Sequence, residues 1–359
     1  MNIKALINRV LYPKPERVLG IDIRADRIKI AQLDMKADKT PEVTDYVIMD
    51  LPENLRNNGF VDNPEDMGNF LAEIINKHGF STKECVFTLG GRNAFVRGIT
   101  MPPMTAAELS QAVLWDSAQY VPYEADTYYV DHAVYGDIDS EGQQPVVLVA
   151  APKNIVDSIV KIAEQVELNI LQISIDVLAV YRLIGDEMQN FILLEFGRTY
   201  SLLTIFQKGA PVAQRSIPGG TISFAKVIAE KMNVSVMDAL EILRGENLLT
   251  GSAIENQSVK EALVLEVENV VKECRRTTEY YILNKKDASF SNLVVCCNDI
   301  IVPGLTETMN DRIDMKVINF SVLEKINFDS RFEKKKVEQS APTLAVAIGA
   351  ALSGGDAND

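Results

Sequence analysis

Two acidic residues interrupt apolar segments that otherwise have the character of buried strands. Asp22 lies in the apolar run of residues 18–23, and Glu195 lies in the run of residues 191–196. An unpaired buried charge is costly, so a carboxylate in such a place indicates a use. Turn amides can bind phosphate, and a nearby acid can hold its Mg²⁺ through water. We expect Asp22 and Glu195 at such a site; the alternative is an ordinary hairpin with Asp22 at its exposed end.

A polar turn and a second apolar strand follow each acid, so two segments of the chain share one pattern. They cover residues 18–34 and 191–206, about 170 residues apart, and two related halves could therefore face each other across a cleft. Paired glycines, Gly219 and Gly220, precede a further expected helix, where free backbone amides favour an anion. The alternative there is a glycine-rich loop that only turns the chain into the helix.

The surrounding sequence predicts alternating strands and helices that would position these turns. Asn63 before Pro64 predicts the start of a helix that ends at Gly79. Thr105 and Glu108 have the spacing of a capping box at the start of another helix. We expect further strands over residues 42–51, 85–89, 94–99, 146–151 and 168–174, and further helices over residues 154–167, 175–184, 259–283 and 341–352.

The composition argues against several classes of protein. The 359 residues carry a net charge of −14, whereas a nucleic-acid partner would need a basic face. No apolar run approaches the roughly 18–20 residues that span a bilayer, and the start lacks the pattern of a secretory signal. Four cysteines without metal spacing fit a reduced cytoplasmic compartment. Residues 1–12 form a basic amphipathic segment, which either docks on its own domain or contacts an anionic membrane surface.

The paired hairpins resemble the phosphate-binding hairpins of the actin, heat-shock ATPase and sugar-kinase superfamily. Within it, the chain resembles the PilM family of type IV pilus assembly and, more distantly, FtsA. The most specific stretches are residues 101–104, Met-Pro-Pro-Met, residues 120–123, Tyr-Val-Pro-Tyr, and residues 273–281. The resemblance covers essentially the whole chain in order.

The resemblance implies an α/β, actin-like (ribonuclease H-like) fold. Its duplicated domains would have central mixed sheets, an inserted 1C-type subdomain and a helical 2B-type subdomain. The implied boundaries are residues 1–100 and 175–190 for subdomain 1A, 101–174 for 1C, 191–222 and 289–359 for 2A, and 223–288 for 2B.

The resemblance also implies ATP as a cofactor, with Mg²⁺ held through water by Asp22 and Glu195. The implied nucleotide-binding set is Asp22, Arg24, Ala25, Lys29, Glu195, Gly197, Arg198, Thr199, Gly219, Gly220, Arg276, Cys297, Asn298 and Asp299. The chain departs from the family pattern at residues 297–299, which replace the glycines that lie against the adenosine. Arg24 stands where a small residue is usual, and either contacts phosphate or fills its space. We therefore expect no catalytic residue and at most a weak ATPase.

The function implied is a cytoplasmic scaffold, peripheral to the inner membrane. It would bind the N-terminal cytoplasmic peptide of a bitopic, PilN-like protein, with ATP as a gate, and pilus motor ATPases and self-association would be further contacts. We expect an extended peptide in a groove between subdomains 1A and 1C near residues 85–125. The expected contacts are Val86, Phe87, Phe95, Leu109, Val113, Tyr120, Pro122 and Tyr123.

Two other functions remain open from the sequence. A small-molecule kinase of the superfamily would need an acid between the halves. Asp176 is the candidate, although its position predicts a helix cap. An FtsA-like filament former is the other alternative, and the sequence has no C-terminal membrane-binding helix of the kind FtsA would carry.

Overall fold

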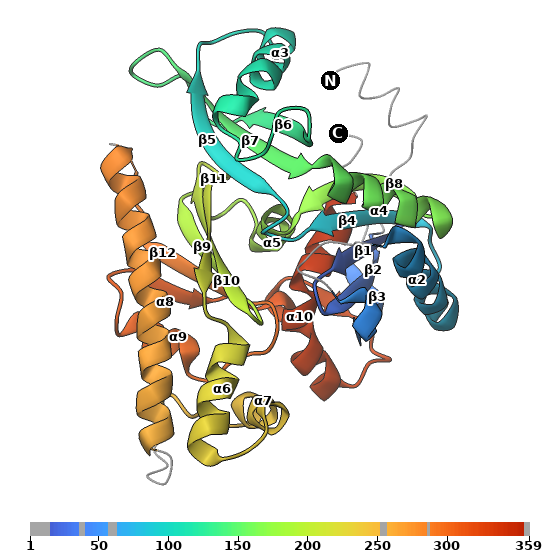
Figure 1. Ribbon diagram of the computed structural model, residues 1–359, viewed down its shortest axis with the longest axis vertical. Helices are drawn as coiled ribbons and strands as arrows, with labels where there is room; N and C mark the ends of the chain where they lie inside the picture. The colour runs from blue at the N-terminus through green and yellow to red at the C-terminus, as the bar shows by residue number, and fades with distance from the viewer. Residues whose placement is uncertain (1–14, 36–39, 57–62, 252–256, 286–287, 355–359) are drawn as a thin grey trace.

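The computed structural model describes residues 15–35, 40–56, 63–251, 257–285 and 288–354. In these ranges two mixed β-sheets with flanking helices form the two halves of the molecule (Figure 1). The basic segment predicted at residues 1–12 lies outside the described residues. No helix within them is long and apolar enough to cross a membrane.

The first sheet has six strands in the order β14-β3-β2-β1-β4-β8. Their bounds are Arg17–Ile23 (β1), Arg27–Asp34 (β2), Glu42–Asp50 (β3), Glu84–Leu89 (β4), Asn169–Ile175 (β8) and Asn327–Phe328 (β14). The helices packed on this sheet are α2 (Pro64–His78), α4 (Lys153–Gln165), α5 (Asp176–Ile184) and α10 (Lys334–Gly354). β1 to β3 form an antiparallel meander, and β4 and β8 continue the sheet in parallel.

The second sheet has eight strands in the order β13-β12-β9-β10-β11-β5-β7-β6. Their bounds are Phe95–Met101 (β5), Tyr128–Val134 (β6), Gln144–Pro152 (β7), Phe191–Phe196 (β9), Tyr200–Gln207 (β10), Ala210–Pro218 (β11), Asn292–Cys297 (β12) and Lys316–Asn319 (β13). The remaining α-helices are α3 (Ala106–Asp116), α6 (Thr221–Met232), α7 (Val236–Gly245), α8 (Gln257–Asn284) and α9 (Leu305–Asn310). The insertion of β5, β6, β7 and α3 thus extends the sheet of the second half.

Sheet membership differs from the predicted boundaries in two places. The insertion predicted at residues 101–174 has other bounds in the structure. It begins at Phe95 with β5, and its predicted last part belongs to the first half, because β8 is a strand of the first sheet and α4 packs on it. The segment 289–359 divides, because β14 pairs with β3 and α10 packs on β1, β2, β4 and α5. The first half therefore completes its core with the last helix of the described chain.

Glycines let α10 approach its neighbours backbone to backbone. A Cβ built on Gly20 of β1 would lie 1.7 Å from the carbonyl oxygen of Ala347. A Cβ built on Gly349 of α10 would lie 1.9 Å from the carbonyl oxygen of Ala179 in α5. Larger side chains at these glycines would separate the elements, so the small residues of the last helix are a packing requirement.

The predicted helix starts agree with the structure where the cause is local. The Asn63 side chain accepts a hydrogen bond from the Asp66 amide, and Gly79 ends α2 in the left-handed conformation at φ 66°. Thr105 and Glu108 form the complete capping box of α3. Asp176 is the exception: Ile175 is the N-cap residue of α5, with no side-chain cap.

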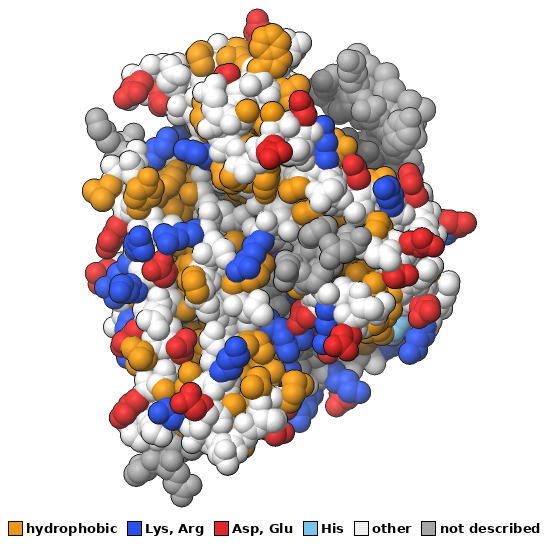
Figure 2. Space-filling view, in the orientation of Figure 1, with side chains coloured by type: hydrophobic (Ala, Val, Ile, Leu, Met, Phe, Trp, Pro, Cys, Tyr) orange, Lys and Arg blue, Asp and Glu red, His pale blue; other side chains and the backbone are white. Residues whose placement is uncertain are grey.

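Charged side chains of both signs are interspersed over the face shown in Figure 2. At the top, over α3, apolar side chains gather at the surface (Figure 2), where Leu114 and Trp115 are exposed. This apolar surface belongs to the insertion.

Candidate functional site

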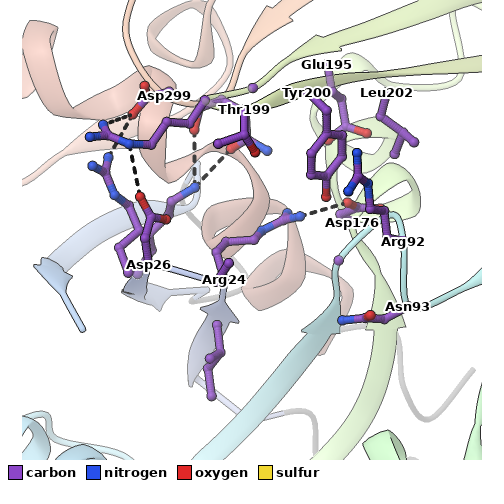
Figure 3. Close-up of a pocket in the computed structure, with 18 residues that line it drawn as sticks. Arg24, Asp26, Arg92, Asn93, Asp176, Glu195, Thr199, Tyr200, Leu202 and Asp299 are labelled. Carbon is purple, nitrogen blue, oxygen red and sulfur yellow. Dashed lines mark hydrogen bonds and ion pairs between the residues drawn. The ribbon is translucent and has the colours of Figure 1, made fainter. Parts of the chain in front are cut away.

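The two matching hairpins meet at a cavity of about 380 Å³ between the halves (Figure 3). We call this cavity the cleft. The structure brings nine of the predicted nucleotide-binding residues to its lining: Arg24, Ala25, Lys29, Glu195, Gly197, Arg198, Thr199, Asn298 and Asp299. The two copies of the strand–acid–turn pattern therefore face each other across one space.

The other five predicted residues do not line the cleft. Asp22 lies behind the first turn, fully buried. Gly219 and Gly220 pack at the start of α6, and Cys297, the last residue of β12, is buried in the core. Arg276 is 69% exposed on α8, where it pairs with a glutamate of its own helix, and this placement corrects its predicted role at the nucleotide.

The carboxylate of Asp22 is held by two cations of its own hairpin. Its Oδ1 lies 2.6 Å from Nε of Arg24, and its Oδ2 lies 3.3 Å from Nζ of Lys29. The hydroxyl of Thr88 donates to Oδ1 at 3.2 Å. Burial alone would raise the pKa of Asp22, but the charges of Arg24 and Lys29 outweigh it and hold the pKa below its ordinary value. Asp22 is therefore an ionised carboxylate with a cation near each oxygen.

Arg24 extends toward a further buried acid, Asp176 at the start of α5 (Figure 3). Its Nη1 lies 3.1 Å from Oδ2 of Asp176, which also accepts the backbone N–H of Gly91 at 2.7 Å. Burial raises the pKa of Asp176, and Arg24 partly opposes that rise. Asp176, the acid that a kinase would need, is held by these donors rather than aimed at a substrate.

Asp299 is the centre of a group of contacts that joins the two halves. Nη1 of Arg27, from β2, lies 2.8 Å from its Oδ1, and Nη1 of Arg198 lies 3.6 Å from the same oxygen. Thr221, the first residue of α6, donates its hydroxyl to Oδ2. Nε of Arg198 in turn lies 3.0 Å from Oδ2 of Asp26 in the opposite turn.

A further contact near these ion pairs joins the amino group of Lys29 to an uncharged residue, Asn298. Nζ of Lys29 donates to Oδ1 of Asn298 at 3.1 Å and to its carbonyl oxygen at 3.2 Å. Lys29 lies on β2 and Asn298 follows β12, so this contact also crosses between the halves. The cleft network, as we name it, consists of Asp22, Arg24, Asp26, Arg27, Lys29, Asp176, Arg198, Asn298 and Asp299.

Glu195 differs from every acid in the cleft network. It is 3% exposed, and neither carboxyl oxygen has a hydrogen-bond partner in the part of the chain that the structure describes. Burial raises its pKa well above the ordinary value, and the negative charge of Asp176 adds to the rise. Burial thus disfavours the charged form of Glu195, which does not suit the predicted magnesium site. No cluster of three or more metal-ligating side chains occurs among the described residues.

Sequence reasoning missed several residues of the cleft. The further lining residues are Ile23, Asp26, Arg27, Gly90, Arg92, Asn93, Tyr200 and Leu202, besides Asp176, which the sequence analysis considered as the acid of a kinase. The guanidinium of Arg92 lies 4.0 Å from the ring centroid of Tyr200, from the opposite hairpin. Asp26 and Arg27 directly follow Ala25 in the first hairpin, so their place in the cleft could have been predicted from the sequence. Nothing in the sequence indicates a place in the cleft for Arg92, because only the fold brings it to Tyr200.

The predicted partner-binding residues do not form a groove. Val86 and Phe87 are buried in β4, which is covered on both sides by β1 and β8. Leu109 and Val113 are buried on the inner face of α3, in the small core of the insertion. The other four, Phe95, Tyr120, Pro122 and Tyr123, also lie in the insertion and line no described cavity. The four buried side chains, Val86, Phe87, Leu109 and Val113, are not accessible to a partner in this structure, and the rest of the contact set stays a prediction.

A larger apolar groove of about 660 Å³ lies elsewhere, between β6 of the insertion and β8 of the first sheet. β6 is the last strand of the eight-stranded sheet, and β8 is the last strand of the six-stranded sheet. Apolar lining residues include Tyr129, Val134, Val149, Ile173, Leu178 and Tyr181. We call it the edge-strand groove. Its lining residues are later in the sequence than the predicted groove near residues 85–125, which stays a prediction.

The groove and the cleft share a thin wall. At the end of β4, Leu89 lines the groove and the next residue, Gly90, lines the cleft. At the start of α5, Ile175 lines the groove and Asp176 lines the cleft. The two cavities are thus formed by opposite sides of the same two strand ends.

Solved structures share this architecture. A structure of a PilM-PilN type IV pilus biogenesis complex matches with a TM-score of 0.77 at 21% identity, over 95% of this chain and 99% of that chain. The ethanolamine utilization protein EutJ from Carboxydothermus hydrogenoformans matches with a TM-score of 0.54 at 12% identity, over 94% and 90% of the chains. MreB5 of Spiroplasma citri bound to ADP matches with a TM-score of 0.52 at 9% identity, over 95% and 96%.

These likenesses show an actin-like fold, as the sequence predicts. No curated protein matches the sequence at a significant level. The family model described as type IV pilus assembly protein PilM matches residues 20–354, which include both hairpins and the insertion. The chain therefore belongs to the PilM family of type IV pilus assembly proteins.

Proposed function

We propose that this chain is a scaffold of type IV pilus assembly that holds an extended segment of a PilN-like partner in the edge-strand groove. The observation that carries the proposal is the meeting of two sheet edges over an apolar floor. β6 pairs with β7 and β8 pairs with β4, so one backbone edge of each stays open among the described strands. An open edge is the site at which an extended peptide can add a strand.

The groove also offers side-chain recognition. Successive side chains of an added strand point in opposite directions, so every second one would face the apolar floor near Ile173 and Leu178. Asp131, Asp186 and Lys208 lie among the lining residues and provide charged contacts at the rim. A peptide with alternating apolar side chains would fit this arrangement.

The family membership and the structural likeness to the PilM-PilN complex support the choice of partner. With such a partner, the scaffold would lie on the cytoplasmic side of the inner membrane, where the N-terminal segment of a bitopic protein is accessible. Contacts with pilus motor ATPases and self-association stay predictions. A scaffold of this kind needs no turnover, and the acid a kinase would use, Asp176, is held by Arg24 and Gly91.

Peptide binding by single-residue variants tests the proposal. Val134→Arg places a charge in the groove at a side chain that is 44% exposed, so the fold tolerates it. Trp115→Arg, at an 83% exposed apolar side chain on α3 outside the groove, is the matched control. With a labelled synthetic peptide of the cytoplasmic N-terminus of the PilN-like protein, we expect Val134→Arg to weaken binding about tenfold or more, as for loss of an interface anchor.

The control should bind like the unmodified protein. Equal affinity of all three proteins would show that the peptide binds elsewhere. Loss of binding in Trp115→Arg alone would place the contact on α3, and the groove proposal would then be wrong.

A further inference from the structure

The cleft already contains an anion of the chain's own, the carboxylate of Asp299. It is 3% exposed and accepts from Thr221, the first residue of α6, while Arg27 and Arg198 supply its positive partners. The start of a helix flanked by two arginines is a place where a phosphate would otherwise be stabilised. The carboxylate of Asp299 stands there instead.

The backbone amides at this helix start are also used within the chain. The N–H of Thr221 donates to the carbonyl of Gly197 at 3.0 Å, and the N–H of Ile222 donates to the carbonyl of Arg198 at 2.9 Å. A Cβ built on Gly220 would lie 2.5 Å from the first of these oxygens. The paired glycines therefore let α6 approach the second hairpin, and the anion site predicted there is satisfied by the hairpin's own carbonyls.

The charges around the cleft balance. The described cationic side chains that line it are Arg24, Arg27, Lys29, Arg92 and Arg198. The acids are Asp26, Asp176, Glu195 and Asp299 in the lining, with Asp22 directly behind. These five cations and five acids leave no net positive charge for a dianionic ATP–Mg²⁺ complex. A polyphosphate would have to displace internal carboxylates from buried partners, which costs more than an exposed exchange.

The acids that would hold the metal are unsuited as well. Both oxygens of Asp22 lie near cations of the first hairpin, and Glu195 is 3% exposed in a strand whose other side chains are all buried and apolar. The residues present therefore do not fit ATP–Mg²⁺. Three contacts of the cleft network connect the two halves directly. They run from Arg27 to Asp299, from Arg198 to Asp26 and from Lys29 to Asn298.

We propose that the cleft network holds the two halves of this chain closed in place of a nucleotide, and that the chain does not bind ATP–Mg²⁺. Two halves joined by their own side chains form one rigid support, independent of the nucleotide level. The proposal concerns the cleft only and does not use the edge-strand groove, so either can fail without the other.

Thermal unfolding of the unmodified full chain with ATP–Mg²⁺ is the first test. A ligand present at about 100 times its Kd stabilises a fold measurably and raises its Tm. We expect no rise with millimolar ATP–Mg²⁺ and no heat of binding by calorimetry. A rise in Tm, or saturable binding, would overturn the proposal.

The second test follows the distance between the halves. Spin labels at Asp50→Cys in β3 and Glu241→Cys in α7 report across the cleft from exposed positions, while the four native cysteines are buried. We expect one narrow distance distribution that ATP–Mg²⁺ leaves unchanged. Asp299→Asn should broaden this distribution, whereas Asp314→Asn, at an exposed position, should not.

Two results would contradict the proposal that the cleft network holds the halves closed. A distribution that is already broad in the unmodified chain shows that the halves are not joined. An unchanged distribution in a folded Asp299→Asn variant shows that the ion pairs of Asp299 do not hold them. If Asp299→Asn does not fold, the nucleotide titration of the unmodified chain still decides the proposal.

Discussion

Replacing Asp22 by asparagine should destabilise the fold strongly, although no ligand is involved. Asn keeps the shape of the side chain but leaves Arg24 and Lys29 without the charge that lies 2.6 Å and 3.3 Å from them. Removing one partner of a buried ion pair costs about 3–5 kcal/mol. Arg24 retains Asp176 and Lys29 retains Asn298, so we expect the lower end, about 3 kcal/mol.

The expected change in melting temperature follows from the size of the chain. An unfolding entropy of roughly 2.1 cal/mol/K per residue gives about 0.75 kcal/mol/K for this chain, so about 3 kcal/mol corresponds to a fall of about 4 °C. Calorimetry or circular dichroism at pH 7 would measure it. Asp50→Asn is the control, because Asp50 is 67% exposed and lies 3.5 Å from Arg27; an exposed pair contributes about 1 kcal/mol or less.

The difference in stability between the wild type and Asp22→Asn should depend on pH in a defined direction. The pKa of Asp22 is held below its ordinary value in the folded chain. The stabilisation is therefore complete above the ordinary pKa, near pH 4, and is lost as the pH falls through the lower folded value. The gap between wild type and Asp22→Asn should narrow below about pH 4. A fall in Tm at pH 7 no larger than that of Asp50→Asn would refute the reasoning.

Three further predictions concern buried groups. Glu195→Gln should match the wild type near pH 4 and exceed its stability at higher pH, since the raised pKa of Glu195 makes the wild type lose stability as the pH rises above the ordinary pKa, by about 1.4 kcal/mol per pKa unit; parallel urea-unfolding curves at all pH values would contradict this. Gly349→Ala should cost about 3 kcal/mol or more by urea unfolding, because its Cβ would meet a backbone carbonyl of α5, whereas Gly245→Ala, with open space, should be neutral or slightly stabilising. Burial raises the pKa of Cys85 and Cys274 to about 12, so iodoacetamide at pH 8 should label them only after unfolding, and labelling of the native protein would show that these sites open.

Features whose cause is local were predictable from the sequence. The cap at Asn63, the capping box at Thr105 and the stop at Gly79 depend on residues within one turn. The repeated strand–acid–turn pattern around Asp22 and Glu195 predicted that two hairpins would face each other, and they line one cavity. Such patterns need no knowledge of the tertiary fold.

The partners of the charged groups were not predictable in this way. Arg27 and Asp299 are 272 residues apart, and their contact depends on how the halves close. The same holds for the groove. A strand such as β4 shows its apolar character in sequence but not its central place, which buries Val86 and Phe87. An edge strand has a paired neighbour on one side only. Which strands lie at an edge is known only from the order of the strands in the sheet.

The packing of α10 on β1 has a consequence for the synthesis of the chain. β1 leaves the ribosome early, but the helix that covers its sheet, with Ala347 against Gly20, is among the last segments of the described chain. At roughly 5–20 residues per second, about 330 residues take some 15–65 s to translate. During that time the strands β1, β2 and β4 lack the helix that packs on them, and α5 lacks its main helical neighbour. The first half therefore completes its core only after α10 has been made, and we expect an early stop before α10 to leave this half without its full core.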